Sequence, residues 1–291
     1  MRILNYGSLN IDHVYGVQHF VRPGETIGST SYTRFCGGKG LNQSVALARA
    51  GAEVWHAGKI GAEGKFLKER LLADGVNVDF VDEVDAPTGH AVIQVDSNGE
   101  NAIVIHGGAN RAITRIDAER VLATFSPKDL LLLQNEISAL TDLMALATAR
   151  GMRVVFNPAP FGPEVSDYPL QNVDLFILNE TEGQGLTGRA GADEIADAML
   201  TRFTGAAIIL TLGARGALYK DEARSFEATA QRVEAVDTTA AGDTFIGFFL
   251  ALYTRGLDVR HCLEVACRAA TLCVTRAGAA DSIPTLAEIT C

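Results

Sequence analysis

Short runs of apolar residues alternate along the chain with longer segments in which apolar residues recur every three or four positions. The short runs predict buried strands at Ile3–Ser8, Val54–Ala57, Asp129–Leu133, Val154–Asn157, Leu175–Leu178 and Ala207–Thr211. The periodic segments predict amphipathic helices at Leu41–Ala50, Lys65–Asp74, Ala139–Arg150 and Asp193–Phe203. This alternation is typical of an α/β fold, with a central, mostly parallel sheet and helices on both faces.

Two regions break the alternation. Thr88–Val95 and Glu100–His106 are strand-like and flank the turn sequence Asp96–Gly99, whereas Val14–Phe35 lacks a helical period and contains the turn Pro23-Gly24. We expect segments of about 10–35 and 88–106 to form a small antiparallel β lid over the carboxyl ends of the main strands. The lid belongs to a single predicted domain of residues 1–291, which ends in two apolar helices between Ala240 and Thr275.

Charge and cysteine content exclude several protein classes. The 291 residues include 25 Lys and Arg against 35 Asp and Glu, a net charge of −10, with no basic block to neutralise nucleic acid phosphates. No apolar run approaches the roughly 18 residues that cross a bilayer, and no secretory signal is expected. The five cysteines form no CxxC pair, which is typical of reduced thiols, so we expect a cytoplasmic protein that binds neither nucleic acid nor membrane.

Two glycine-containing segments carry the candidate chemistry. Cys36–Gln43 holds three glycines within four residues and leads into a predicted helix, so its backbone amides could approach an anionic ligand closely. Val236–Phe245 has small residues before a second helix, with Asp243 in the first turn. The residues alone leave two interpretations open for each segment. Cys36–Gln43 is either a plain glycine-rich turn or a ligand cradle. Asp243 in the second segment is either a stabilising first-turn acid or a general base.

Familiar signatures of other enzyme classes are absent. No Gly-Lys pair is followed by Ser or Thr, so there is no Walker A loop, and no G-x-G-x-x-G follows the first strand. The nucleophile elbow G-x-S-x-G and the zinc motif H-E-x-x-H are also missing.

Gly37–Asn42 and Asp237–Asp243 resemble the two signatures of the PfkB, or ribokinase-like, carbohydrate kinases. Further segments match the family in the same order and cover nearly the whole chain. They are Asn10–Asp12, Pro23–Thr26, Gly108–Asn110, Asn157–Pro160, Asn179–Glu182, Thr211–Gly216 and Val274–Ala279. The segment Ala240-Ala241-Gly242-Asp243 is similar to the ribokinase branch, where the broader family has Gly-Ala-Gly-Asp.

The resemblance implies a role for each matched residue. It assigns Asp243 as the general base and Ala240, Ala241 and Gly242 as an anion hole. The residues implied to hold the sugar are Asn10, Asp12, Gly38, Lys39, Asn42, Glu136 and Asp243. Those implied to bind ATP are Asn179, Thr211, Gly213, Arg215, Gly216, Gly242 and Cys267.

The same resemblance implies two metal ions. Mg²⁺ would accompany ATP, with Glu182 acting through water. K⁺ or a similar monovalent cation would activate the enzyme at Asp237, Thr239, Cys273, Arg276, Gly278 and Ser282. For Asp237 a role as a turn-capping acid stays open.

The implied activity is ATP-dependent phosphorylation of the primary hydroxyl of a free pentose, first of all D-ribose to ribose 5-phosphate. Leu41 and His90 depart from the family pattern where they could contact the sugar, so deoxyribose, another sugar, a nucleoside or pseudouridine stays open as acceptor. A non-catalytic sugar or nucleotide sensor is the alternative from another class. Exposed strand edges and an apolar face on the lid predict a homodimer formed lid to lid.

Overall fold

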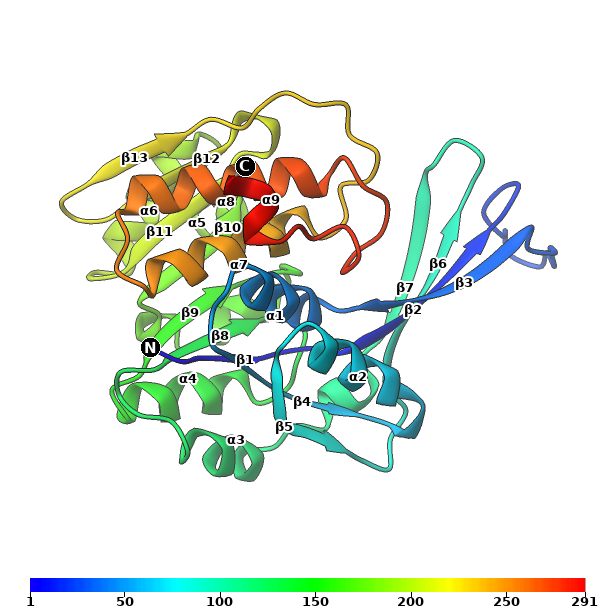
Figure 1. Ribbon diagram of the computed structural model, residues 1–291, viewed down its shortest axis with the longest axis horizontal. Coiled ribbons are helices and arrows are strands. Elements are labelled where there is room, and N and C mark those ends of the chain that lie inside the picture. The colour runs from blue at the N-terminus through cyan, green and yellow to red at the C-terminus, as the bar shows by residue number, and fades with distance from the viewer. Residues whose placement is uncertain (291) are drawn as a thin grey trace.

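The computed structural model describes residues 1–290 and shows a three-layer α/β body from which a small sheet projects (Figure 1). Within these residues the main sheet has nine strands in the order β13-β12-β11-β10-β9-β8-β1-β4-β5. Neighbouring strands from β5 to β11 pair in parallel, whereas the pairs β11 with β12 and β12 with β13 are antiparallel. The predicted fold class is therefore confirmed. The strands are β1 (Ile3–Tyr6), β4 (Val54–Ile60), β5 (Asn77–Glu83), β8 (Leu130–Gln134), β9 (Arg153–Asn157), β10 (Leu175–Asn179), β11 (Ala207–Thr211), β12 (Ala217–Lys220) and β13 (Ser225–Ala228).

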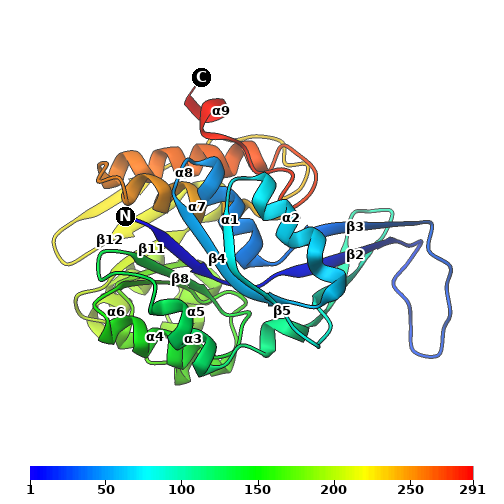
Figure 2. The same cartoon turned by 60° about the horizontal axis from the view of Figure 1, so that its bottom comes forward.

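Helices cover both faces of this sheet (Figure 2). One face carries α1 (Lys39–Arg49), α2 (Lys65–Ala73), α7 (Ala241–Tyr253), α8 (Val259–Cys273) and α9 (Leu286–Thr290). The other carries α3 (Arg115–Leu122), α4 (Leu140–Ala149), α5 (Glu180–Thr187) and α6 (Ala192–Arg202). Successive strand residues such as Leu130 and Leu131 belong to different core clusters, because side chains alternate across a strand. Short 3₁₀ helices at Ala62–Gly64, Gly108–Arg111, Pro163–Asp167, Leu170–Asn172 and Gly213–Arg215 lie in the connections.

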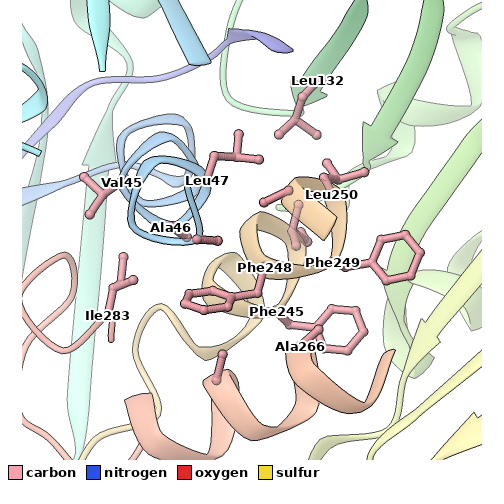
Figure 3. Close-up of a cluster of buried hydrophobic side chains, with 14 of the residues drawn as sticks. Val45, Ala46, Leu47, Leu132, Phe245, Phe248, Phe249, Leu250, Ala266 and Ile283 are labelled. Atoms are coloured by element: carbon pink, nitrogen blue, oxygen red, sulfur yellow. The ribbon is translucent and has the colours of Figure 1, made fainter. Parts of the chain in front are cut away.

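The core on the first face joins the three helices on which the site depends. Phe245, Phe248 and Phe249 of α7 are buried in the core that also contains residues of α1 and α8 (Figure 3). These aromatic side chains remove a large apolar area from water and hold α7 in this core. The predicted pair of apolar helices between Ala240 and Thr275 corresponds to α7 and α8.

The lid is a four-stranded sheet in the order β3-β2-β6-β7. Its strands are β2 (Asn10–Gly16), β3 (Ser31–Gly37), β6 (Gly89–Val95) and β7 (Asn101–His106), and the predicted turn at Asp96–Gly99 joins the last two. The outer pairs are antiparallel as expected, but the central pair, β2 with β6, is parallel. The difference arises because β2 follows β1 and β6 follows β5, so both leave the main sheet at the same edge in the same direction.

Two further sequence expectations concern cysteines and membranes. Cys36, Cys262, Cys267 and Cys273 are free thiols, and Cys291 lies outside the described residues. Among helices built from residues 1–290, none has both the length and the apolar character needed to cross a bilayer.

Candidate active site

The site lies where the carboxyl ends of the parallel strands meet the N-termini of α1 and α7. Two glycines let α1 begin there: Gly38 takes a positive φ of 95°, and a Cβ on Gly40 would lie 2.3 Å from the backbone nitrogen of Ser8. Only glycine allows this turn and this approach at low cost. The result brings the first turn of α1 against the loop between β1 and β2, at the base of the lid.

Asp243 is buried in the first turn of α7, with 6% of its surface exposed. Its carboxylate accepts hydrogen bonds from two consecutive residues of α1, from Asn42 Nδ2 at 3.1 Å and from Gln43 Nε2 at 2.9 Å. Neutral amides satisfy the buried acid without neutralising it. The sequence signatures at Asn42 and Asp243, 201 residues apart, therefore meet in one place.

The residues before Asp243 form a compact backbone cradle. Ala240 is left-handed at φ 60°, and its carbonyl accepts the first helical hydrogen bond from Thr244 N. The Ala241 amide makes a 3.3 Å bond to the Thr238 carbonyl, whereas the amides of Ala240 and Gly242 donate to no group within residues 1–290. Gly242 is exposed, and a Cβ there would meet no atom within 4 Å. This helix N-terminus is a backbone anion site of the kind that binds phosphates.

Lys39 lies among three carboxylates. The pKa of Lys39 is raised, first by the charge of Asp243 and then, against the effect of burial, by Glu136 and Glu182. Burial raises the pKa of Glu182, and the charge of Asp243 raises it further, while Lys39 acts in the opposite direction. One lysine thus lies among three carboxylates at a buried centre, and groups whose pKa values are shifted in this way are common at active sites.

The predicted sugar residues gather beneath the lid. Glu136 Oε2 accepts hydrogen bonds from the Ser8 hydroxyl and from Lys39 N at 3.0 Å. Burial, together with the charge of Glu136, raises the pKa of Asp12 to about 7. Asp12 on the lid therefore lies near Glu136, and the two carboxylates together can accept hydrogen bonds from the hydroxyls of a polyol.

Asn10 is held by a residue that the sequence reasoning did not place in the site. Asn110 Nδ2 donates to Asn10 Oδ1 at 2.7 Å, and Asn110 Oδ1 accepts from Leu9 N at 3.0 Å. The Gly108–Asn110 match to the family was the available signal for Asn110.

The two departures from the family pattern lie away from these groups. Leu41 is fully buried in the core between helices. His90 neighbours Ala91, the residue paired with Asp12, so it lies on the opposite face of the lid from Asp12. The expectation that these two residues could contact the sugar is therefore wrong, because one packs inward and the other faces away.

Asn179 and Glu182 bind each other. Asn179 caps α5 by accepting from Glu182 N at 2.9 Å, and Glu182 Oε2 accepts in return from Asn179 N at 3.0 Å. This reciprocal capping box fixes the N-terminus of the helix. It also holds the Glu182 carboxylate buried and close enough to Lys39 and Asp243 to affect its pKa.

The predicted nucleotide residues on β11 and its following turn lie next to β13 and α8. Gly216 has φ 108°, and a Cβ there would lie 1.9 Å from the Ala228 carbonyl. The same carbonyl accepts from the Cys267 thiol at 3.9 Å. Cys267 is buried, and burial raises the pKa of its thiol to about 11, so the thiol is protonated and faces the protein interior. Exposed Arg215 pairs with Glu180, and Gly213 is exposed beside it.

The six predicted cation residues lie around one loop, although their side chains do not all face it. Asp237 accepts from Thr239 N at 2.8 Å and from Gly278 N at 3.0 Å. Burial raises the pKa of Asp237, but these hydrogen bonds outweigh burial and leave it below its ordinary value. Cys273 Sγ lies 3.1 Å from Ser282 Oγ and 3.8 Å from the Thr239 carbonyl. The Arg276 side chain instead pairs with Glu288 at 2.7 Å.

One carboxylate among carbonyl and hydroxyl oxygens suits a monovalent cation. In the described part of the chain, no cluster of three or more His, Cys, Asp or Glu could hold a metal ion. Any cation here would depend mainly on neutral oxygens, which are ligands for hard cations.

Comparison with known proteins identifies the class to which this architecture belongs. A ribokinase from Haemophilus influenzae is 37% identical over 97% of this chain and 95% of its own length. A deoxyribokinase from Salmonella typhi is 32% identical over 99% and 97%. The structure of Arabidopsis thaliana ribokinase complexed with ribose and ATP superposes with a TM-score of 0.86 at 30% identity, covering 99% of this chain and 97% of that one.

The doubly wound sheet, the lid and the paired helix N-termini thus define an ATP-dependent sugar kinase. The model of the pfkB family of carbohydrate kinases matches residues 2–286, and the chain belongs to that family.

Proposed function

We propose that this enzyme transfers the γ-phosphoryl group of ATP to the primary hydroxyl of a free pentose, first of all D-ribose, forming ribose 5-phosphate. The observation that carries the proposal is the buried Asp243 carboxylate beside the backbone cradle of Ala240–Gly242. A carboxylate at this point can take the proton of a hydroxyl while the adjacent amides receive the negative phosphoryl oxygens. Phosphoryl transfer requires this positioning and charge stabilisation more than covalent chemistry.

The sugar is held by residues from both sides of the cleft. Asn10 and Asp12 reach it from the lid, while Gly38, Lys39, Asn42 and Glu136 hold it from below. Asp12 and Glu136 accept hydrogen bonds from sugar hydroxyls, and Asn42 donates while it also orients Asp243. Such a site rejects acceptors that lack a hydroxyl, because a buried polar group is then left unpaired.

ATP binds at the carboxyl ends of β10 and β11, on the other side of Asp243 from the sugar. The residues that contact it are Asn179, Thr211, Gly213, Arg215, Gly216 and Gly242, and the buried Cys267 lies behind the adenine side. The carboxylate of Glu182 fits Mg²⁺ bound with ATP, held through water, and that ion neutralises phosphate charge when bound. K⁺ or a similar ion fits close to the backbone cradle, at Asp237, Thr239, Cys273, Arg276, Gly278 and Ser282.

Two relatives act on different pentoses, so the acceptor has to be tested directly. D-Ribose, 2-deoxy-D-ribose, a hexose, a nucleoside and pseudouridine are compared at matched concentration with Mg-ATP, with and without K⁺, by ADP release. Proton-coupled ³¹P NMR then locates the phosphate on the product. D-Ribose should give the highest kcat/KM and a 5-phosphate. A higher value for another acceptor reassigns the substrate, and the absence of ADP release with every acceptor favours a non-catalytic sensor.

The lid supports a homodimer. Exposed apolar residues lie on three of its strands and are concentrated on the edge strand β7: Tyr32, Val92, Ile103, Val104 and Ile105. Pairing with a second lid covers this surface and the unpaired edge together. We place the dimer in the cytoplasm, where its thiols stay reduced.

A further inference from the structure

Behind Asp243 lies a buried group of amide and hydroxyl side chains that neither the sugar nor the nucleotide assignment uses. Gln43, Gln134, Asn5 and Ser44 are all 0% exposed, and Asn157 is 5% exposed. They come from α1 and from three adjacent strands, β1, β8 and β9. Burial of this much polar surface is unfavourable unless the groups pair with one another.

Gln43 is fully paired within this group. Its Nε2 donates to Asp243 Oδ1 at 2.9 Å and to Asn157 Oδ1 at 3.2 Å, and its Oε1 accepts from Gln134 Nε2 at 2.7 Å. A side-chain amide has two donor hydrogens, so these bonds use both of them. The contact with Asp243 is therefore one of three hydrogen bonds that fix the Gln43 amide within this group.

The rest of the group fixes the direction of this amide. Gln134 Nε2 also donates to Asn5 Oδ1 at 2.8 Å, and Asn5 Nδ2 donates to Ser44 Oγ and to the Gly40 carbonyl, each at 2.8 Å. Because both hydrogens of Gln134 are committed to acceptors, Gln43 must present its oxygen to Gln134 and its nitrogen to Asp243. The reversed amide would place its oxygen against the oxygens of Asp243 and Asn157, and its NH2 group against the NH2 group of Gln134.

The group reaches one more titratable residue. Ser44 Oγ lies 2.8 Å from His56 Nδ1, and burial lowers the pKa of His56 to about 3. His56 is therefore neutral at physiological pH, so the pairing at this end does not change with the protonation of the ring. The whole arrangement from His56 to Gln43 is uncharged.

From this geometry we propose that Gln43 is a positioning residue for catalysis, which holds the Asp243 carboxylate in the orientation that meets the acceptor hydroxyl and is itself oriented by Gln134. The inference rests on the proposed role of Asp243 as the base. Asn42 binds the other carboxylate oxygen, so two neutral donors together fix the plane of the carboxylate. A neutral donor orients the base without competing for the proton, which a lysine or an acid at this position would do.

The test is a double-mutant cycle. Gln43→Met keeps the length of the side chain and removes its donors, so we expect kcat to fall about 10- to 100-fold, with the KM values for sugar and ATP within about 2-fold of wild type. In the Asp243→Asn background, the same substitution should cause no further loss, because Gln43 acts through Asp243. Rates are normalised to the active-site fraction from calorimetric titration with sugar, so partial misfolding does not imitate the effect.

Two more variants complete the experiment. Gln134→Met leaves Gln43 in place and should lower kcat about 3- to 10-fold, with no additional loss when combined with Gln43→Met. It also tests the proposal if Gln43→Met does not fold. The matched control is Asn135→Leu, which removes a buried amide bonded to the Pro160 carbonyl at 2.8 Å and to Glu164 at 2.9 Å, outside this group. It should lower Tm while leaving kcat per active site unchanged.

The outcomes separate the inference from the function on which it rests. A wild-type rate for Asp243→Asn contradicts the base itself and thereby both proposals. A large loss in Asp243→Asn with a wild-type rate in Gln43→Met contradicts only the role of Gln43. Equal losses from Gln43→Met in both backgrounds show a structural effect independent of the base, and these also overturn the inference.

Discussion

Gly247 of α7 packs directly against Ala46 of α1, and a Cβ on Gly247 would lie 2.3 Å from the Ala46 Cβ. The contact lies one helical turn from the site on both helices, since Asp243 precedes Gly247 by four residues and Asn42 precedes Ala46 by four. The two helices therefore run in the same direction with their N-termini together. Their close approach sets the distance between the acid and the amides that hold it.

Gly247→Ala should separate the two helices. We expect overpacking to cost about 1–3 kcal/mol, a Tm decrease of about 2–10 °C, and a fall in kcat of about 10-fold as Asp243 moves away from Asn42 and Gln43. Thermal unfolding and steady-state kinetics measure the two effects. Gly28→Ala is the control, because its Cβ would meet no atom within 4 Å and it should change neither quantity. A wild-type kcat in Gly247→Ala would show that the helix spacing does not set the site geometry.

Binding of the sugar should depend on the protonation of Asp12. Its pKa of about 7 means that the folded protein carries a neutral Asp12 well below pH 7 and an ionised one above it. The ionised form is the stronger acceptor for a sugar hydroxyl, so kcat/KM for the sugar should rise about 5- to 10-fold between pH 6 and pH 8.

Asp12→Asn cannot titrate and provides the comparison. Its kcat/KM should be lower at pH 8 and should lack the part of the pH dependence due to Asp12. If kcat/KM of Asp12→Asn rises by the same factor of about 5 to 10 between pH 6 and pH 8, the pH dependence belongs to another group.

Asp237→Asn should abolish activation by K⁺. The substitution removes the charge of the cation loop but keeps an oxygen that can accept from Thr239 N or Gly278 N. Initial rates over a KCl series, with tetramethylammonium chloride holding ionic strength constant, separate a bound ion from general screening. Retention of wild-type K⁺ activation in the variant would remove Asp237 from the cation site.

The loop that carries Gly278 and Ser282 is tied to α1 and α2 by two arginines. Arg49 Nη1 donates to the Ala280 and Ile283 carbonyls, and Arg70 Nη2 donates to the Ala280 carbonyl at 3.0 Å. Asp74 accepts from Arg49 Nε at 2.7 Å and from Arg70 Nε at 2.6 Å. Arg49→Met should therefore loosen the loop and raise the half-activating K⁺ concentration about 3- to 10-fold. Lys65→Met is the control, because Lys65 pairs only at the surface with Glu83, and it should leave that concentration unchanged.

The lid should control the oligomeric state. Ile103→Asp combined with Ile105→Asp places two charges on the exposed edge strand, and we expect light scattering to give a monomer of 30.9 kDa where wild type gives twice that mass. Ile116→Asp is the control, because Ile116 is 76% exposed on α3 away from the lid. A wild-type monomer at micromolar concentration would contradict the proposed dimer.

The sequence predicted the central strands well because a parallel strand is buried on both faces. Ala207–Thr211 was predicted with the bounds of β11, since its apolar run is continuous. The edge strand β5 was missed because Asp79, Asp82 and Glu83 interrupt its pattern, and β12 and β13 are only four residues each. The helix α5 was missed because Gly183 and Gly185 lower its helix propensity, although Asn179 and Glu182 form a capping box at its start.

The candidate site was predictable mainly where residues lie within a sequence signature. Asn42 and Asp243 were named from two such segments, and they are joined by a hydrogen bond. Gln134 had no signature, because it ends an apolar strand and meets Gln43 only through an interaction across 91 residues. The sequence could not show that pairing, and it gave no sign that His90 would face away from Asp12, which depends on the register of β2 and β6.

Asp243→Asn most directly tests the central claim that this carboxylate is the base. The substitution keeps the size of the side chain and one acceptor oxygen but removes the basic group, and sugar-dependent ADP release is measured at saturating ATP. The account predicts a fall in kcat of about 100- to 10,000-fold, with binding of the sugar retained in calorimetry. A kcat within about 2-fold of wild type would contradict it.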